Sequence, residues 1–324
     1  MKEGVRMLRY IMNRILSALC TLFILSILIF SIIHLTPGDP ARIMLGADAS
    51  QEEVDALTER LGLNEPLIKQ YGDWMGGVLH GDLGISYSRN GTVTEEIIKS
   101  MRPTITLAAW GLLLTVVIAI PLGIFAAKKK GKIADSVVVG FSLLGISIPS
   151  FLLSVILVIV FSVNLKIFPV AGYKTIDEVG LVEHIRYIAL PVISLALMQV
   201  AMLTRMTRAS MIDVINNDYI KTAKAKGVKE RIIVYKHALR NALIPILTTI
   251  GQIFATLLSG AAVVETVFNI SGIGQLIVNS VQKRDYPVIQ GIVVVVSIIY
   301  IVINFMIDIL YGSIDPRIRV VKKS

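Results

Sequence analysis

The sequence predicts an all-α polytopic membrane protein with about six transmembrane helices, and three observations support this fold class. Of the 324 residues, 54% are hydrophobic and only 17% are charged. The mean hydropathy is +0.73. The apolar residues are also gathered in long blocks. Because soluble domains average about 25% charged residues and disordered chains hold little apolar material, these observations exclude both a disordered chain and an ordinary soluble enzyme.

Six apolar stretches are long enough to cross a bilayer, which requires about 20 residues of helix. They cover residues 15–35, 105–127, 136–165, 185–203, 242–264 and 288–311. The first is too long for a signal peptide and no A-x-A site follows it, so we expect it to stay as an anchor. The fourth is the weakest, because it is short and contains Pro191. Membrane helices tolerate proline, so we expect kinks, arising either along a pathway or from packing alone.

The distribution of basic residues predicts the orientation of the chain. Cytoplasmic loops of membrane proteins are enriched in Lys and Arg. Twenty-one of the 32 basic residues lie in the two terminal tails, in residues 128–132 and in residues 205–241. Residues 36–102 hold eleven acidic residues. We therefore expect both termini in the cytoplasm and residues 36–102 outside. The net charge of +9 then follows from this topology and does not indicate binding to nucleic acid.

The external segment is long enough to fold. Ser50 and Glu53 have the spacing of a capping box, which begins a helix. Apolar residues recur at helical spacing after this box, and again after Pro66: Val54, Leu57 and Leu61, then Leu67, Tyr71, Trp74, Met75 and Val78. We expect two short helices that pack on the membrane domain, with some remaining surface available to an external partner.

The cytoplasmic loop at residues 205–244 is the most informative segment. Asp218 is a suitable N-cap residue, and residues 219–226 contain no helix breaker. Gly227 stands where a left-handed C-cap would end this helix. One face collects Tyr219, Ile220, Ala223 and Gly227. A second helix at residues 229–243 then runs into the fifth span, so the loop predicts two short helices that dock a cytoplasmic partner. A solvated topology signal is the alternative.

The chain lacks the motifs of several enzyme classes. It contains no nucleotide-binding glycine loop, no metal-binding H-E-x-x-H or C-x-x-C motif and no G-x-S-x-G motif. Cys20 is the single cysteine, and the four histidines do not cluster in the sequence. Asp308 is the one clear ionisable residue inside a predicted span. If the protein transports actively, we expect the energy to come from another subunit.

Residues 218–227 and 237–245 closely resemble the EAA loop of ABC-importer permeases, in particular those of the dipeptide, oligopeptide and nickel branch. The usual glutamate is absent, because the matching positions read Lys221-Thr222-Ala223 with Gly227. Further segments resemble that branch in the same order along the chain. They are residues 34–40, 81–84 and 147–151, Glu265 to Phe268 with Gly272 and Gly274, residues 284–287 with Asp285 and Tyr286, and residues 315–317.

This resemblance implies a type I ABC importer permease fold, with residues 1–102 as tail, first helix and external segment and residues 103–324 as the permease core. It implies the first subunit of a permease heterodimer in a prokaryotic plasma membrane, two cytoplasmic ATPases, an external substrate-binding protein and surrounding lipid. ATP and Mg would be bound by the partner subunits, and this chain would hold no cofactor, no metal and no catalytic residue. The implied ATPase-coupling residues are Asp218, Tyr219, Ile220, Thr222, Ala223, Ala225, Lys226 and Gly227. The implied external gate or binding-protein contacts are Glu265, Phe268, Gly272, Gly274, Asp285 and Tyr286.

Polar residues among apolar neighbours predict where a pathway runs. Polar groups in lipid are costly unless they face protein or water. We expect some of them to line a cavity beside the partner permease, and hydrogen bonds between helices are the alternative. The residues concerned are Ser142, Ser147, Gln199, Gln252, Thr256 and Ser259.

The leading hypothesis is the membrane subunit of an ATP-driven importer of short peptides. A nickel or metal-chelate importer of the same family is the first alternative, since the external binding protein selects the cargo. A secondary transporter is a second, although the sequence shows no coupling-ion site. A membrane scaffold or receptor is a third, and it would need neither kinked spans nor an EAA-like loop.

Overall fold

The computed structural model describes residues 2–35, 40–46, 49–89 and 91–314. In this part of the chain the regular secondary structure is helical, and β-structure is limited to one isolated bridge between Ile85 and Thr92. The predicted all-α fold class is confirmed. The chain divides into two compact units. The first contains residues 1–102 and 275–302, and the second contains residues 103–274 and 303–324.

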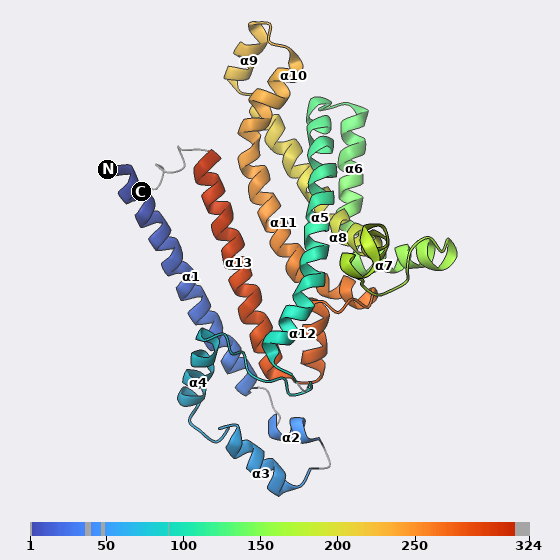
Figure 1. Ribbon diagram of the computed structural model, residues 1–324. Helices are drawn as coiled ribbons and strands as arrows, with labels where there is room; N and C mark the ends of the chain where they lie inside the picture. The colour runs from blue at the N-terminus through green and yellow to red at the C-terminus, as the bar shows by residue number, and fades with distance from the viewer. Residues whose placement is uncertain (1, 36–39, 47–48, 90, 315–324) are drawn as a thin grey trace. The chain divides into compact units, whose positions relative to one another are not determined.

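The first unit contains the N-terminal apolar helix and the helices of the segment that follows it (Figure 1). It is built from α1 (Lys2–Leu35), α2 (Pro40–Leu45), α3 (Gln51–Arg60), α4 (Leu67–Leu79), the start of α5 (Val93–Lys128), most of α12 (Ile273–Gln282) and the start of α13 (Tyr286–Ile314). The predicted capping box is confirmed, because Ser50 N donates to Glu53 Oε2 at 2.9 Å and Glu53 N donates to Ser50 Oγ at 3.3 Å. The two predicted external helices are α3 and α4.

The second unit is a bundle around α8 (Ile176–Ile215), which packs most extensively against three other helices. These are α6 (Ile133–Ser147), α7 (Ser150–Leu157) and α11 (Leu239–Val267). The rest of the unit comprises the remainder of α5, the π-helices η1 (Val158–Asn164) and η2 (Ile233–Ala238), the short helices α9 (Asp218–Ala225) and α10 (Glu230–Ile232), the start of α12 and the end of α13. In Figure 1, α9 and α10 lie beyond the ends of α8 and α11.

The predicted third span, residues 136–165, is wrong as a single helix. The helix α6 ends at Ser147, α7 begins at Ser150, and the two segments are bent by 94°. Pro149 causes the break, because a proline disfavours helical conformation in the residue before it. Ile148 accordingly has φ −87° and ψ 117°. Five helices in the described residues are long and apolar enough to cross a membrane, or six if the bent pair counts as one span.

The predicted fourth span is longer than its apolar run suggested. The helix α8 has 40 residues and continues through Pro191, which is buried. Its start is interrupted at Gly180, where φ is +77°. Membrane helices tolerate such a proline because neighbouring groups can satisfy the carbonyl that it frees.

Candidate functional site

The helix α9 begins one residue earlier than the sequence predicts. Its N-cap residue is Asn217, with the extended values φ −69° and ψ 149°, so the prediction that Asp218 caps the helix is wrong. The backbone carbonyl of Asn217 accepts from Ile220 N at 3.0 Å. Asp218 is already helical, and its carboxylate instead accepts from Lys221 Nζ at 2.8 Å.

The other end of α9 is closed by a Schellman motif, in which two backbone bonds cap the last turn. Val228 N donates to Ala223 O at 3.2 Å, and Gly227 N donates to Lys224 O at 3.0 Å. This geometry places Gly227 at φ +75°, so the predicted left-handed cap is confirmed. A Cβ at Gly227 would meet no atom within 4 Å. The position therefore requires glycine for its backbone conformation and not for lack of space.

One side of α9 is held by the protein and the other is exposed. Ile220 is fully buried and Ala223 is half-buried, whereas Tyr219 is 44% exposed and Gly227 is exposed, so the four residues predicted on one face do not form one buried face. The hydroxyl of Tyr219 accepts from Asn241 Nδ2 at 2.7 Å, which ties α9 to the start of α11. The exposed remainder of the helix and its cap consists of Asp218, Lys221, Thr222, Lys224, Ala225 and Lys226.

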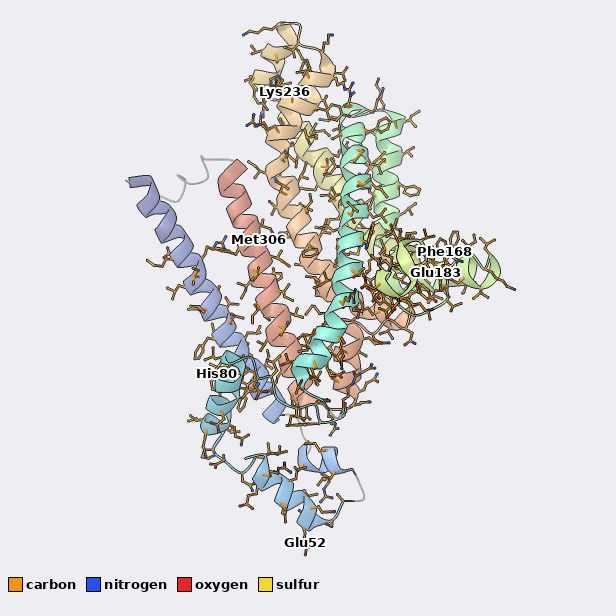
Figure 2. The ribbon with its side chains drawn as sticks, in the orientation of Figure 1. Glu52, His80, Phe168, Glu183, Lys236 and Met306 are labelled. Carbon is orange, nitrogen blue, oxygen red and sulfur yellow. The ribbon has the colours of Figure 1, made fainter. Side chains whose placement is uncertain are left out.

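Two ion pairs join further segments at this end of the second unit. Lys128 Nζ lies 3.4 Å from Glu230 Oε1, which links the end of α5 to α10. Arg208 of α8 donates to Asp135 of α6 through Nε at 2.6 Å and Nη2 at 2.7 Å. Lys236 lies at the same end, on η2 (Figure 2). Two of the predicted cytoplasmic segments, residues 128–132 and the loop that contains α9, therefore meet at one end of this unit.

The sequence analysis missed the Asp135–Arg208 pair. The carboxyl side chain of Asp135 is only 6% exposed, and its Oδ2 also accepts from Gly131 N at 3.0 Å. The one available signal was an aspartate that follows a cationic turn at the start of an apolar span. Sequence spacing gave no indication of its partner, because that partner is 73 positions away.

A second cluster lies where α11 ends, at Glu265. This residue is fully buried, and its Oε1 accepts from Thr104 Oγ1 at 2.6 Å. The same hydroxyl oxygen of Thr104 accepts from Ile273 N at 2.8 Å. Phe268 is 2% exposed, and its carbonyl accepts from Gly172 N at 2.7 Å. These bonds tie α5, α11, the start of α12 and the segment before α8 to one another.

Two glycines allow the start of α12 to approach α11 closely. A Cβ at Gly272 would lie 2.2 Å from the carboxyl carbon of Glu265. A Cβ at Gly274 would lie 2.2 Å from Ala262 Cα. No side chain fits at either distance. The close approach of the start of α12 to α11 at Glu265 therefore depends on glycine at both positions.

In the first unit, Asp285 accepts four hydrogen bonds from one short segment, residues 86–88. They come from Ser86 Oγ at 2.5 Å, Ser88 Oγ at 2.8 Å, Tyr87 N at 2.9 Å and Ser88 N at 3.0 Å. Burial, reinforced by the charge of Asp285, raises the pKa of the Tyr87 hydroxyl to about 12, so Tyr87 is neutral at physiological pH. Tyr286 is 6% exposed, and its hydroxyl has no hydrogen-bond partner among the described residues.

The predicted external residues thus divide between the two units. Glu265, Phe268, Gly272 and Gly274 belong to the second unit, and Asp285 and Tyr286 belong to the first. Within each unit they are buried anchors or close-packed glycines rather than freely exposed contact residues. Their common property is that they hold loop segments in place.

The predicted pathway residues fall into two groups. Gln252, Thr256 and Ser259 form an exposed stripe along α11, and Ser147 is exposed at the end of α6. Ser142 and Gln199 are buried. The four hydroxyls among the six residues each donate to the carbonyl four positions earlier in the same helix. Since such a bond satisfies a hydroxyl without a partner helix or water, a serine or threonine in these spans is weak evidence for a pathway.

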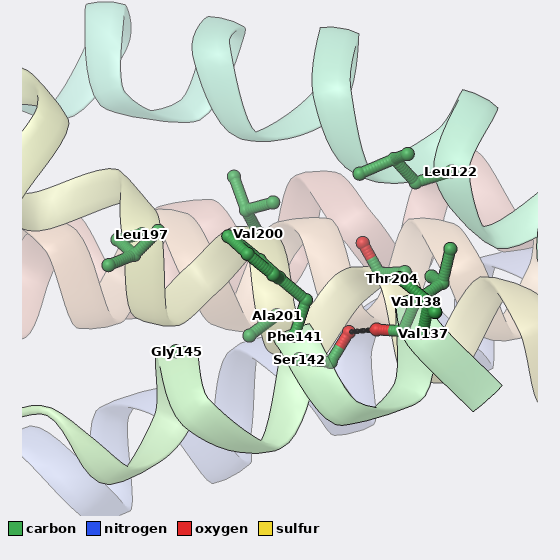
Figure 3. A pocket seen from close by; sticks show the side chains of 10 residues that line it. All are labelled: Leu122, Val137, Val138, Phe141, Ser142, Gly145, Leu197, Val200, Ala201 and Thr204. Carbon is green, nitrogen blue, oxygen red and sulfur yellow. Dashed lines mark hydrogen bonds between the residues drawn. The ribbon is translucent and has the colours of Figure 1, made fainter. Parts of the chain in front are cut away.

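A cavity of about 230 Å³ lies between α5, α6 and α8 (Figure 3). Its lining is almost entirely apolar, and the hydroxyl of Ser142 is already bonded to Val138 O at 2.9 Å. The other lining residues are Leu122, Val137, Phe141, Gly145, Leu197, Val200, Ala201 and Thr204. In the part of the chain that the structure describes, no group of three His, Cys, Asp or Glu residues could hold a metal ion. Asp308 lies outside the residues whose side chains are described.

Comparisons with known families and proteins agree with one another. Residues 119–320 match the family described as binding-protein-dependent transport system inner membrane component, and residues 7–108 match the N-terminal region of such components. The chain is 38% identical over 310 residues to the probable peptide ABC transporter permease protein y4tP of Sinorhizobium fredii, covering 96% of this chain and 99% of that protein. It is 39% identical over 313 residues to the glutathione transport system permease protein GsiC of Escherichia coli K12, covering 97% of this chain and 99% of that protein. The resemblance to peptide-branch ABC importer permeases is confirmed.

The fold is also similar to a solved structure. A chain of the MetNI methionine ABC transporter, in an inward-facing conformation, matches with a TM-score of 0.55 at 18% identity. The match covers 68% of this chain and 96% of that chain. The predicted type I ABC importer permease fold is confirmed by this likeness, which concerns the fold alone.

Proposed function

The chain belongs to the family of binding-protein-dependent transport system inner membrane components, and from this premise we propose that it is one of two membrane subunits of an ATP-driven importer of short peptides. An external binding protein delivers the peptide. Two cytoplasmic ATPases bind ATP and Mg and supply the energy, so this chain provides the path and performs no chemistry of its own. The second membrane subunit is a homologue, with this chain as the first of the two.

The observation that carries the proposal is the construction of α9. It is a short helix with a closed C-terminus, held from one side by Ile220 and by the Tyr219–Asn241 bond. Its other side presents small and cationic side chains, Thr222, Ala225 and three lysines. A rigid exposed element of this kind can enter a groove on a partner with little loss of conformational entropy. We infer that this groove belongs to an ATPase subunit.

The ion pairs behind α9 provide a route for the motion of that partner. Arg208–Asp135 joins α8 to α6, and Lys128–Glu230 joins α5 to α10. The Tyr219–Asn241 bond ties α9 to the start of α11, so displacement of α9 would move α11, and the two ion pairs would carry that motion to neighbouring spans of the second unit. ATP-driven closure of the ATPases then moves these spans between inward-facing and outward-facing arrangements.

The orientation follows from charge. The end of the second unit that carries α9 also carries the cationic turn at residues 128–132. Since Lys and Arg accumulate on the cytoplasmic side, we place this end in the cytosol, together with both termini. The Glu265 cluster then faces the exterior. We assign the loop that Glu265 holds and the loop that Asp285 holds, each within its own unit, to contacts with the binding protein.

The exposed stripe of Gln252, Thr256 and Ser259 on α11 is the part of the predicted pathway that the second membrane subunit could cover. Gln252 is its strongest member, because an amide needs more hydrogen-bond partners than a hydroxyl and finds none in lipid. We assign this stripe to the translocation path. The buried Ser142 and Gln199 are assigned to packing inside the subunit.

Short peptides are the proposed cargo because the relatives reported above are named for peptide and glutathione transport. The test is uptake by the complete transporter, with its neighbouring subunits and binding protein, reconstituted in vesicles. A labelled dipeptide, labelled glutathione and radioactive nickel are offered separately, with ATP on the ATPase side. We expect peptide uptake that requires both ATP and the binding protein. Uptake of nickel alone would assign the metal branch, and uptake driven by an ion gradient without ATP would assign a secondary transporter.

A further inference from the structure

The external helix α4 has an apolar face, and only part of this face contacts other residues of the protein. Apolar residues recur at positions one, two, five, eight, nine, twelve and thirteen of the helix, which places them on one side. They are Leu67, Ile68, Tyr71, Trp74, Met75, Val78 and Leu79. Lys69 and Asp73 lie on the opposite side, and Lys69 Nζ pairs with Glu65 Oε1 at 2.7 Å.

The membrane helix α1 covers one edge of this face. The ring of Tyr71 meets Phe30 of α1 edge-on, with 5.4 Å between ring centroids, and its hydroxyl lies 2.8 Å from Ser26 Oγ. Trp74 lies 6.0 Å from the same Phe30 ring. Ser26 and Phe30 are 3% and 8% exposed, so the contact is close-packed.

The other edge of the face is uncovered. Ile68 is 88% exposed and Leu79 is 78% exposed, and Met75 between them is half-buried. These three residues are seven and four positions apart, so they follow one line along the helix. No residue of α4 is fully buried. A helix in water would lose stability by presenting such a line to solvent.

The contact with α1 determines the depth of α4 in the membrane. Ser26 and Phe30 lie inside the apolar span Met12–Ser31. Phe30 precedes residue 35, the end of the first predicted apolar stretch, by five residues, which corresponds to roughly 7.5 Å along a helix. Amphipathic helices at an interface bury their apolar face about 5–10 Å into the boundary between headgroups and acyl chains. Trp and Tyr side chains are also enriched at this boundary.

We propose that α4 is a membrane-interface helix, and that the side formed by Ile68, Met75 and Leu79 lies against lipid acyl chains. Lipid is the occupant because Tyr71 and Trp74 already touch α1 at a depth where the surroundings of a single span are acyl chains. A water-soluble binding protein does not reach that depth. The contact anchors the external segment beside α1. The proposal does not depend on the cargo. If the orientation proposed above is correct, α4 lies in the outer leaflet, and this one point rests on the proposed function.

The test measures what surrounds each side of α4. Cys20 is the only cysteine, so Cys20→Ser provides a cysteine-free background. Spin labels are attached to Ile68→Cys or Leu79→Cys, with Asp73→Cys as the matched control on the polar side. The full-length chain, purified with the subunits that accompany it, is reconstituted in phosphatidylethanolamine–phosphatidylglycerol vesicles. Collisions with oxygen, which dissolves in lipid, are compared with collisions with a water-soluble nickel chelate.

We expect the labels at positions 68 and 79 to collide several-fold more with oxygen than with the chelate, and the label at position 73 to show the reverse. Free access of the chelate to both apolar-side labels would overturn the proposal, because that side would face water. Shielding of both labels from both reagents would also overturn it and would identify a protein subunit as the occupant. The two labelled positions are independent, so a variant that fails to assemble leaves the other as the test.

Discussion

Arg208 and Asp135 form a two-bonded ion pair, with Nε–Oδ1 at 2.6 Å and Nη2–Oδ2 at 2.7 Å. The carboxylate is almost fully buried and the guanidinium side chain is 26% exposed. Removing one partner leaves a buried charge alone, whereas removing both leaves none. Replacing one of the two residues is therefore expected to destabilise the protein more than replacing both.

We predict that Arg208→Leu lowers the unfolding free energy of the subunit by about 2–4 kcal/mol. The double variant Arg208→Leu with Asp135→Leu should recover part of this loss, and Arg208→Lys should lie between, because lysine keeps the charge and loses the second bond. Thermal unfolding of the purified complex measures these three variants and the single variant Asp135→Leu. A double variant as unstable as the sum of its single changes would show that the two residues do not interact.

A second prediction concerns Gly227. A side chain at φ +75° costs about 1–2 kcal/mol of backbone strain, and a β-branched residue costs more. Gly227→Val should therefore tilt or unwind the end of α9 without affecting insertion. We expect a stable subunit that loses its ATPases or keeps them with transport abolished. Co-purification and uptake assays measure the two outcomes.

Further variants test whether the effect of Gly227→Val comes from backbone strain at position 227. Gly227→Asn should be milder, because asparagine tolerates the left-handed region. Lys224→Ala should also be mild, because it removes one of three exposed lysines and leaves the helix and its cap intact, whereas Ala223→Asp should behave like Gly227→Val, because it places an unpaired charge at a half-buried position. Transport at the normal rate by Gly227→Val with bound ATPases would remove the docking role of α9.

A third prediction concerns Gly272. The added Cβ of Gly272→Ala would lie 2.2 Å from the Glu265 carboxyl carbon, so either the carboxylate or the start of α12 must move. Overpacking of this kind costs about 1–3 kcal/mol. We expect lower thermal stability and weaker binding of the external binding protein. Gly140→Ala is the matched control, since its Cβ would meet no atom within 4 Å and alanine favours a helix.

A fourth prediction concerns Asp285. In Asp285→Ala the four donors from residues 86–88 lose their acceptor. Each buried unsatisfied donor costs about 1–3 kcal/mol, so this segment should detach. Trypsin should then cut faster at Arg89 in proteoliposomes. Asp82→Ala removes an exposed carboxylate that accepts from Gly84 N and does not touch residues 86–88, and it should leave the cleavage rate unchanged.

A fifth prediction tests the orientation. In the Cys20→Ser background, cysteines at Lys129 and Lys224 should be shielded from an impermeant thiol reagent in intact cells, and a cysteine at Asp55 should react. The reason is the concentration of basic residues around positions 129 and 224. Labelling at position 224 with protection at position 55 would reverse the proposed topology.

Local features were predictable from the sequence because their physical causes act within a few residues. The Ser50–Glu53 capping box and the left-handed Gly227 each depend on hydrogen bonds between near neighbours, and both are present in the structure. The apolar spans were predictable because a bilayer requires a minimum helix length. The exceptions were also local. Pro149 broke a predicted span, and Asn217 rather than Asp218 caps α9.

The tertiary structure alone decided which distant groups meet. Asp135 and Arg208 are 73 positions apart, Thr104 and Glu265 are 161 apart, and Ser86 and Asp285 are 199 apart. No periodicity in the chain relates such residues, because their contact depends on how whole helices pack. Composition and local spacing therefore determined the membrane class, the spans and the exposed capped helix. Packing decided which buried carboxylates hold the loops at the ends of those spans, because each carboxylate needs donors that only a neighbouring segment can supply.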